Sequence, residues 1–377
     1  MKIGLVAGEA SGDLLGAGLI RAIRERVPDA TFEGVAGPAM IDAGCDGWED
    51  SEALAVMGLI EPLTEIPRLL SLRRSLVRRW RQSPPDVFVG IDAPDFNFGL
   101  EKKLRRSGIS TVHYVSPSIW AWRAGRIKTV RAAADRVLCI LPFEKAIYDE
   151  AGIDAVFVGH PKADSLPNDI DVSSARRMLG LDASRVVAVM PGSRSGEVSR
   201  LGPLLAGAAA LLAESDDDIQ FVTPAATATL RPLIEAQLLQ AGVADRCVVT
   251  DGGSIEVMAA ADVVLLASGT AALEAALLGK PTVAAYAVSG FSAAIFRLFR
   301  LLKTEYFTLP NLLTETPLIP EFIQEAVTAE ALAESVRSLL DDPARRTDIA
   351  QQFITLRAAL ALGADERAAE AVLELTK

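Results

Sequence analysis

Short apolar runs alternate with amphipathic helical stretches along this chain, and the alternation occurs twice. The first set of runs covers residues 2–7, 87–91, 110–114, 136–140 and 155–158. The second set covers residues 186–190, 221–223, 247–250, 263–267 and 282–286. Strands that are apolar throughout are buried on both faces, and strands that alternate with helices form parallel sheets. The sequence therefore predicts an α/β protein with two Rossmann-like, doubly wound domains.

The domain boundary is expected near Gly159, after the last run of the first set. At 377 residues the chain exceeds the usual size of one compact core. Residues 1–163 are expected to form an N-terminal domain and residues 164–342 a C-terminal domain. The helical segment 343–377 can pack on either of them.

Charge and composition exclude several classes of protein. Half of the residues are hydrophobic (50%), so the chain can form packed cores and is not disordered. The net charge of −11 argues against a nucleic-acid partner, because phosphate backbones select positive surfaces. Three separated cysteines and two histidines predict neither a disulfide framework nor a metal site. Stretches free of charge are too short to span a bilayer, so a cytoplasmic protein is expected.

The first strand is followed by the turn Gly-Glu-Ala-Ser-Gly-Asp at residues 8–13. Its spacing is not the GxGxxG of a dinucleotide site, which disfavours a dehydrogenase. The glycines allow a close backbone approach, and the amides of the following helix can meet an anion or a hydroxyl. A tight turn in which Ser11 or Asp13 caps the helix explains the same residues, and the spacing alone favours it.

Two carboxylates, Asp92 and Asp95, follow the run 87–91. The carboxyl end of a strand is where α/β proteins place their chemistry, so Asp92 is interpreted as a general base for a hydroxyl. Asp95 is better suited to capping the helix that follows. Further along the chain, Trp120 precedes four cations between Arg123 and position 131, which can hold an anionic substrate beside an apolar group. Aromatic packing beneath a solvated basic helix explains that segment equally well.

The predicted second domain contains two strand-to-helix junctions that can bind phosphate. At the first, Ser193 and the helix amides can donate to phosphate oxygens, and Arg194 adds a bidentate cation. The GK[ST] ending of a P-loop is missing, so an ATPase is poorly supported.

The second junction consists of Ser268, Gly269 and Thr270, and Glu274 follows one helical turn later. A carboxylate there is suited to a ribose diol. An ordinary capped helix explains either junction alone, but two of them in one domain favour a nucleotide diphosphate site.

Two segments, 59–80 and 291–303, combine large apolar residues with arginine and lysine. Basic amphipathic helices of this kind lie on anionic lipid surfaces, and apolar grooves nearby can receive acyl chains. A core helix with its cations towards water, or a homodimer face, explains one such segment. The presence of two makes contact with a membrane surface a serious hypothesis.

Taken in order, the motifs resemble those of the lipid-A-disaccharide synthase family, glycosyltransferases of the GT-B fold. In the N-terminal half they are VAGEASGD from residue 6, GVAGPAM from 34, AVMG from 55, GIDAPDFN from 90, HYVSPSIWAWR from 113 and LPFEK from 141. In the C-terminal half they are PGSRSGE from 191, LLASGTAALE from 265 and LPNLL from 309. The matches extend over nearly the whole chain.

The resemblance implies two Rossmann-like domains that face a cleft, and a last helix that crosses back to the first domain. It implies transfer of 2,3-diacylglucosamine from its UDP derivative to 2,3-diacylglucosamine 1-phosphate, with no cofactor. Ser193 and Arg194 would lie at the pyrophosphate, with residues 268–270 nearby. Glu274 would lie at the ribose and Asn311 close to the donor.

For the acceptor, the resemblance marks both Asp92 and Glu9. Asp92 is the first choice as general base, and Glu9 is the second candidate or an orienting residue. Four further positions are expected to bind the acceptor or its lipid: Ser11, Gly12, Trp120 and Arg123. The enzyme is expected on the cytoplasmic face of an inner membrane. The alternatives are another GT-B enzyme of UDP-sugars, such as an epimerase, and a non-catalytic lipid- or nucleotide-binding protein.

Overall fold

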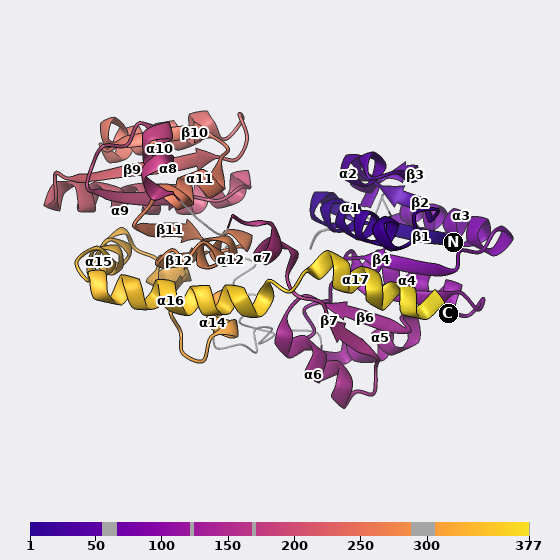
Figure 1. The fold of residues 1–377 in the computed structure, drawn as a ribbon. Helices are drawn as coiled ribbons and strands as arrows, with labels where there is room; N and C mark the ends of the chain where they lie inside the picture. Colours follow the sequence, from indigo (N-terminus) through magenta and orange to yellow (C-terminus); the bar gives the residue numbers. More distant parts are fainter. Residues whose placement is uncertain (55–65, 121–123, 168–170, 288–305, 377) are drawn as a thin grey trace. The chain divides into compact units, whose positions relative to one another are not determined.

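The computed structural model describes residues 1–54, 66–120, 124–167, 171–287 and 306–376, which form two compact units (Figure 1). The first unit comprises Met1–Asp164 together with Leu360–Lys377, and the second comprises Ser165–Ala359. Among the helices of the described ranges, none combines the length and the hydropathy needed to cross a bilayer.

The first unit is built on a sheet of seven parallel strands. These are β1 (Lys2–Ala7), β2 (Thr31–Ala36), β3 (Cys45–Asp50), β4 (Val87–Ile91), β5 (Ser110–Tyr114), β6 (Arg136–Cys139) and β7 (Ala155–Phe157). Their order across the sheet is β3-β2-β1-β4-β5-β6-β7. The order reverses between β1 and β4, and the helices that follow these two strands cover opposite faces of the sheet. A crevice at the carboxyl ends of such a strand pair is where open α/β sheets bind ligands.

Helices pack on both faces of this sheet and complete its cores. On one face lie α1 (Glu9–Arg26) and α17 (Ala364–Leu373), which bury alanine and leucine side chains against β1 and β4. On the other face lie α3 (Ile66–Gln82) and α4 (Pro94–Arg105), which bury Trp80 and Phe96. The remaining helices of this part of the chain are α2 (Pro38–Asp42), α5 (Ile127–Ala133), α6 (Pro142–Glu150) and α7 (Pro161–Ser165).

The second unit repeats the architecture with six parallel strands. These are β8 (Arg185–Met190), β9 (Ile219–Ala225), β10 (Cys247–Asp251), β11 (Val263–Ala267), β12 (Thr282–Tyr286) and β13 (Glu321–Ile323), in the order β10-β9-β8-β11-β12-β13. The helices are α8 (Val172–Leu179), α9 (Ser195–Ser215), α10 (Arg231–Ala241), α11 (Ser254–Ala260), α12 (Thr270–Leu277), α14 (Leu309–Leu313), α15 (Ala329–Leu340) and α16 (Pro343–Leu360). The strand order reverses between β8 and β11. The predicted α/β class with two doubly wound units is confirmed.

Three strands were not predicted from the sequence, because they lack a continuous apolar run. β2 contains Glu33 and a glycine, and only part of its length is buried. β3 is an edge strand with mostly exposed side chains, so its sequence CDGWED carries no burial signal. β13 has three residues and lies at the edge of the second sheet.

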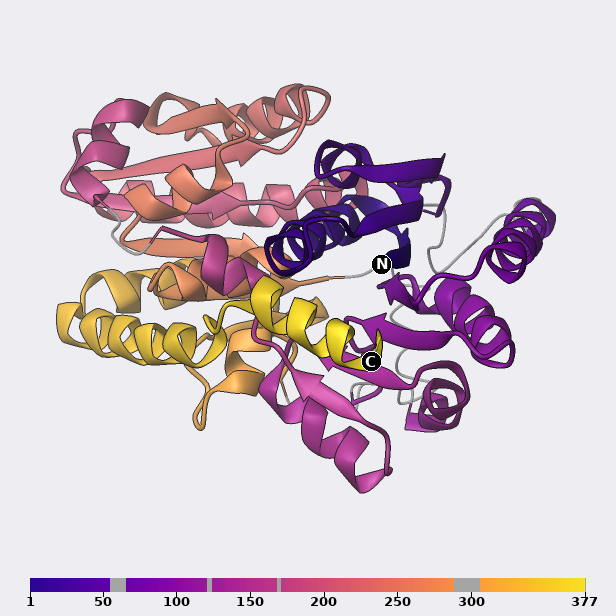
Figure 2. The ribbon, with the colours of Figure 1, turned by 45° about the vertical axis from the view of Figure 1, so that its right-hand side comes forward.

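The end of the chain completes the first unit. Figures 1 and 2 show α17 alongside α1, on the same face of the sheet. The Asp164 carboxylate accepts hydrogen bonds from the backbone N–H groups of Gly363 (3.0 Å) and Ala364 (2.7 Å), at the start of α17. The backbone N–H of His160 donates to the carbonyl of Leu360 at 2.8 Å. The N-terminal stretch thus fixes the place where the returning chain begins its last helix.

We expect Asp164→Ala to destabilise the first unit by about 1 kcal/mol, because the substitution removes the cap of α17. Urea unfolding followed by tryptophan fluorescence measures this directly, since all four tryptophans precede residue 123. Asp149→Ala, which removes an exposed carboxylate paired with Lys145, is the matched control and should change stability by less than about 0.5 kcal/mol. Equal stability of Asp164→Ala and wild type would show that the cap does not hold α17.

Candidate functional site

The carboxyl edge of the first sheet carries a cluster of unusual backbone conformations. Glu9 follows β1 with φ 60°, and Asp92 and Ala93 follow β4 with φ 51° and 41°. Val115, directly after β5, has φ 77°. Non-glycine residues in this left-handed region are uncommon, and they persist only where the surroundings over-determine them. Three adjacent strands therefore end in turns that the fold holds in place, as is typical of a functional site.

Specific contacts hold the turn after β4. The backbone N–H of Asp92 donates to the carbonyl of Tyr114 at 2.8 Å. The side-chain amide of Asn97 donates to the carbonyl of Asp92 at 2.8 Å. The turn after β1 lies so close that a Cβ at Gly8 would stand 2.6 Å from the Cβ of Ala93. Only glycine permits this approach, which explains the first glycine of the VAGEASGD motif.

The two turns enclose a small cavity of about 120 Å³ that brings Glu9 and Asp92 together. Its lining residues are Gly8, Glu9, Leu54, Asp92, Ala93, Pro94 and Asp95. Ser11 and Gly12 lie further along α1 and do not belong to this lining. Burial raises the pKa of the Asp92 carboxyl, while the nearby His113 and a hydrogen bond from the backbone of Ala93 oppose that rise. A half-buried carboxylate of this kind can accept a proton from a hydroxyl in the cavity.

Two capping predictions were wrong: Asp13 does not cap α1, and Asp95 does not cap α4. Gly8 is the N-cap of α1, and the Asp13 carboxylate instead accepts from the backbone of Gly37 (2.9 Å), Ala39 (2.9 Å) and Met40 (3.0 Å), at the start of α2. The helix α4 begins at Pro94 after Ala93, so Asp95 lies within its first turn. Asp95 forms an ion pair with Arg126 there.

Trp120 packs edge-on against Phe143, with ring centroids 5.3 Å apart and an interplanar angle of 84°. Phe143 and Glu144 belong to the LPFEK motif at the start of α6, and Glu144 accepts a hydrogen bond from the backbone of Leu141 at 3.1 Å. Burial raises the pKa of Glu144 to about 7. Trp120 thus packs against α6, whereas Arg123 lies outside the described residues.

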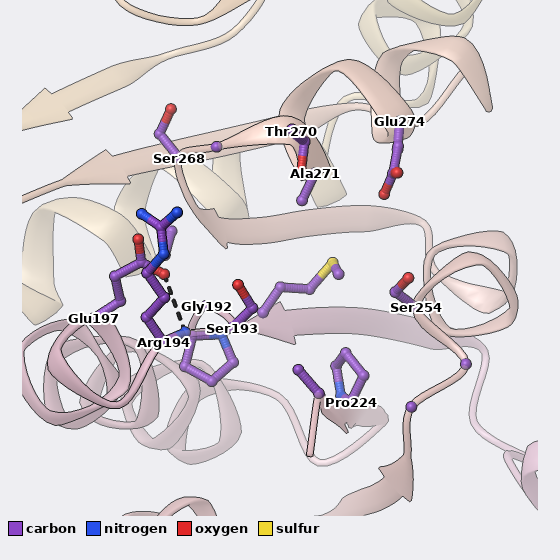
Figure 3. Close-up of a pocket in the computed structure, with 17 residues that line it drawn as sticks. Gly192, Ser193, Arg194, Glu197, Pro224, Ser254, Ser268, Thr270, Ala271 and Glu274 are labelled. Atoms are coloured by element: carbon purple, nitrogen blue, oxygen red, sulfur yellow. Dashed lines mark hydrogen bonds between the residues drawn. The ribbon is translucent and has the colours of Figure 1, made fainter. Parts of the chain in front are cut away.

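The second unit has a larger cavity, of about 510 Å³, at the reversal between β8 and β11 (Figure 3). Ser193 and Arg194 follow β8 and line one side, and Ser268, Gly269 and Thr270 follow β11 and line the other. In Figure 3 the guanidinium of Arg194 is directed into the space between the two junctions. The cavity therefore combines hydroxyl donors, two helix N-termini and a cation, which is the chemistry that binds a diphosphate.

Further residues shape this cavity. Glu274 lies one turn into α12 and faces it (Figure 3). Gly192 has φ 115°, and a Cβ there would stand 2.8 Å from a carboxylate oxygen of Glu197. A third junction, which was not predicted from the sequence, also lines the cavity. It consists of Gly252 and Gly253 followed by Ser254 on α11. The sequence signal for this junction was two consecutive glycines directly after a strand. In the structure both adopt φ 70°, a conformation that favours glycine.

Asn311 does not belong to the lining of this cavity. It is 3% exposed, and both polar atoms of its side-chain amide make hydrogen bonds within the protein. Its Nδ2 donates to the Ile319 carbonyl (2.8 Å) and to a Glu321 carboxylate oxygen (2.7 Å). Its Oδ1 accepts from the backbone of Leu318 and Ile319, both at 2.9 Å. Asn311 thus holds the loop that leads into β13.

Two doubly wound units, one with a diphosphate-type cavity and the other with a carboxylate pair, define the GT-B class of nucleotide-sugar enzymes. Solved structures agree on the fold. UDP-GlcNAc 2-epimerase from Neisseria meningitidis, solved with UDP-GlcNAc, matches with a TM-score of 0.62 at 14% identity, over 100% of this chain and 99% of its own. A glycosyltransferase involved in lipopolysaccharide biosynthesis matches with a TM-score of 0.56 at 15% identity, over 99% of each chain.

Sequence relatives are more specific. The family model described as lipid-A-disaccharide synthetase matches residues 3–373. The lipid-A-disaccharide synthase of Alkalilimnicola ehrlichii is 48% identical over 99% of this chain and 98% of its own length. That of Pseudomonas aeruginosa is 47% identical over 100% of this chain and 98% of its own. The chain belongs to the lipid-A-disaccharide synthetase family and is therefore an enzyme, a glycosyltransferase.

We expect Gly8→Ala to destabilise the first unit by about 1–3 kcal/mol, because the added methyl overlaps Ala93 and forces the two turns apart. Urea unfolding by tryptophan fluorescence measures the loss. Gly125→Ala is the matched control, since a Cβ at Gly125 meets no atom within 4 Å. If both variants unfold at the same urea concentration, the turns are not held in contact.

Proposed function

We propose that the enzyme transfers 2,3-diacylglucosamine from UDP-2,3-diacylglucosamine to 2,3-diacylglucosamine 1-phosphate. The products are the β-1,6-linked lipid A disaccharide 1-phosphate and UDP. The observation that carries this proposal is the cavity at the reversal between β8 and β11. It combines hydrogen-bond donors suited to phosphate with a carboxylate, in a chain that matches this family over residues 3–373. The fold likeness to UDP-sugar epimerases lies at 14% identity and concerns the architecture alone.

On the donor side, Ser193, Arg194 and the residues Ser268–Thr270 bind the pyrophosphate, and Glu274 binds the ribose hydroxyls. As the bond to the anomeric carbon breaks, negative charge develops on the UDP phosphate. Arg194 and the amides at the starts of α9 and α12 stabilise that charge, and they do so more in the transition state than in the ground state. Asn311 acts close to the donor through the loop that its amide holds.

On the acceptor side, the 6-hydroxyl attacks the anomeric carbon directly, and the configuration at that carbon inverts. Asp92 accepts the hydroxyl proton as this bond forms, and Glu9 orients the hydroxyl in the same small cavity. Ser11, Gly12, Trp120 and Arg123 contribute to binding of the acceptor and its acyl chains.

The reaction itself is the primary test. Purified protein is mixed with both substrates in detergent with EDTA, and UDP and disaccharide phosphate are followed together. Formation of both in equal amounts is the expected result. UDP without disaccharide would indicate hydrolysis or another acceptor, and neither product from a folded protein would contradict the proposal.

We expect Asp92→Asn to lower kcat about a hundredfold to ten-thousandfold, because an amide cannot accept the hydroxyl proton. The shape of the side chain is kept, so the melting temperature should not fall. Asp95→Asn, three residues further on and paired with Arg126, is the matched control and should retain far more activity. Near-normal turnover of Asp92→Asn would remove Asp92 as the base and leave Glu9.

The same proposal includes binding to the inner face of the inner membrane. Within the segment 59–80, the described part of α3 packs its apolar residues Leu69, Leu76 and Trp80 on the sheet, so these side chains are not free for lipid. The opposite face, which we term the α3 basic face, consists of Arg74, Arg78, Arg81 and the neighbouring Lys103 around a shallow pocket of about 460 Å³. The segment 291–303 lies outside the described residues.

The α3 basic face supports electrostatic attraction to anionic headgroups, worth about 1 kcal/mol for each cation near the surface. Among the described residues, four cations and no carboxylate line its pocket. A second copy that presented the same face would therefore be repelled, so this face favours a membrane over a homodimer.

We expect the protein to float with anionic vesicles at low salt and to dissociate as the salt concentration rises. A variant with Arg74→Gln, Arg78→Gln and Arg81→Gln should bind less. A control with Lys145→Gln, Arg345→Gln and Arg367→Gln loses the same charge from other exposed positions and should bind like wild type. Equal flotation of the two variants would show that the α3 basic face is not the contact surface.

A further inference from the structure

A buried pair of ionisable side chains lies directly behind the turn that carries Asp92. His113 on β5 and Glu101 on α4 are both 0% exposed. The His113 Nδ1 and the Glu101 Oε1 are 2.7 Å apart, within hydrogen-bonding distance. The proposed function gives this pair no role.

Gly90 makes the pair possible. Gly90 on β4 is the register partner of His113 on β5. A Cβ at Gly90 would stand 2.2 Å from the Glu101 Oε1 and 3.0 Å from the Cβ of Asn97. The carboxylate of Glu101 therefore passes over β4 at the one strand position that has no side chain, and reaches the imidazole on the next strand. Any other residue at position 90 would block this path.

As a packing arrangement, the cluster is unfavourable for the stability of the folded state. Three of its polar atoms, Asn97 Oδ1, Glu101 Oε2 and His113 Nε2, are buried without a hydrogen-bond partner among the described residues. Buried ionisable groups with unused hydrogen-bonding capacity cost stability, and apolar side chains of the same volume would pack at least as well here. A role in packing alone does not account for these residues.

The pair and Asp92 share the same three structural elements. Asp92 follows β4 two residues after Gly90, and its backbone N–H is bonded to Tyr114, the neighbour of His113 on β5. Asn97, one turn before Glu101 on α4, donates to the carbonyl of Asp92 at 2.8 Å. Any shift of the imidazole or of Glu101 is therefore transmitted to the turn that sets the direction of the Asp92 carboxylate.

We propose that His113, oriented by Glu101, is a positioning residue for Asp92, and that its charge favours the ionised, proton-accepting form of the Asp92 carboxylate. The inference rests on the proposed role of Asp92 as general base. Glu101 fixes the imidazole from α4 through the contact with Nδ1, and the missing side chain at Gly90 leaves room for Glu101. His113 thereby acts on the reaction through Asp92 without touching the substrate.

Electrostatics supports this assignment. Burial raises the pKa of the Asp92 carboxyl, and the largest effect that opposes this rise comes from His113. Burial likewise raises the pKa of Glu101, and His113 opposes it. Around the imidazole, α4 contributes Phe98 at a ring distance of 4.4 Å besides Glu101, and the neighbouring strand β6 contributes Val137. Without the charge of His113, Asp92 would hold its proton to a higher pH.

The first test observes the coupling from the side of the imidazole. The chain has two histidines, so the ¹⁵N resonances of both rings can be resolved in the full-length protein. His160 is the internal reference, because burial lowers its pKa to about 4 and its ring stays neutral between pH 6 and 8. We expect Asp92→Asn to shift the ring resonances of His113 and to leave those of His160 unchanged. Identical His113 spectra in wild type and Asp92→Asn would overturn the proposal.

The second test follows kcat/KM for the acceptor against pH in His113→Gln and Glu101→Gln. Both should move the acid limb of the profile to higher pH by about half a unit or more, with KM for the UDP donor unchanged. Thr111→Val is the matched control, because Thr111 is also fully buried, lies on the same strand and face, and loses a polar group without losing charge. A limb that stays in place in folded His113→Gln and Glu101→Gln variants would contradict the proposal.

Outcomes for the inference and for the proposed function can be told apart. If wild type forms no disaccharide, the proposed function fails whatever the spectra show. If wild type forms disaccharide with an acid limb that His113 and Glu101 do not influence, only the present inference fails. If a substitution of His113 prevents folding, the spectra of wild type and Asp92→Asn still decide the question, because neither alters the buried pair.

Discussion

The reversal of strand order, between β1 and β4 in one unit and between β8 and β11 in the other, is the constraint on which both sites depend. At each reversal the helices that follow the two strands cover opposite faces of the sheet, so the carboxyl ends of the strands are left open to a ligand. In the first unit the turns approach so closely that Gly8 is required opposite Ala93. In the second the junctions stay apart and leave a cavity of about 510 Å³. One topology thus yields a small cavity lined by carboxylates and a larger cavity whose lining is suited to an anion.

The two units also differ in how they are completed. The sheet of the first unit has one face covered in part by α17, which the chain supplies only after it has built the second unit. Asp164 and Leu360 lie where the chain passes between the two units. The Asp164 carboxylate accepts a hydrogen bond from the start of α17, and the Leu360 carbonyl accepts one from the backbone of His160. The first unit therefore cannot be completed by its own contiguous stretch of sequence. Truncation before α17 would remove buried alanine and valine side chains from its core.

Much of the architecture could be predicted because ten of the described strands coincide with short apolar runs, and the central ones among them are buried on both faces. The exceptions, β2, β3 and β13, are short, polar or at an edge, and local sequence carries no signal for them. The junctions at Ser193 and Ser268, which the sequence predicts to lie near each other, line the same cavity because both follow central strands. The caps assigned to Asp13 and Asp95 were wrong, since their partners are set by tertiary contacts. The Glu101–His113 pair was unpredictable for the same reason: it depends on the register of β4 against β5 at Gly90.

Under the proposed function, nucleotide binding and proton transfer reside in different units of the chain. Calorimetric titration of UDP, in EDTA, into wild type, Arg194→Gln and Asp92→Asn tests it most directly. We expect Arg194→Gln to weaken UDP binding about tenfold or more, because it loses a charge-assisted bidentate contact. We expect Asp92→Asn to bind UDP like wild type. Unchanged binding by Arg194→Gln, or a comparable loss in Asp92→Asn, would contradict that division.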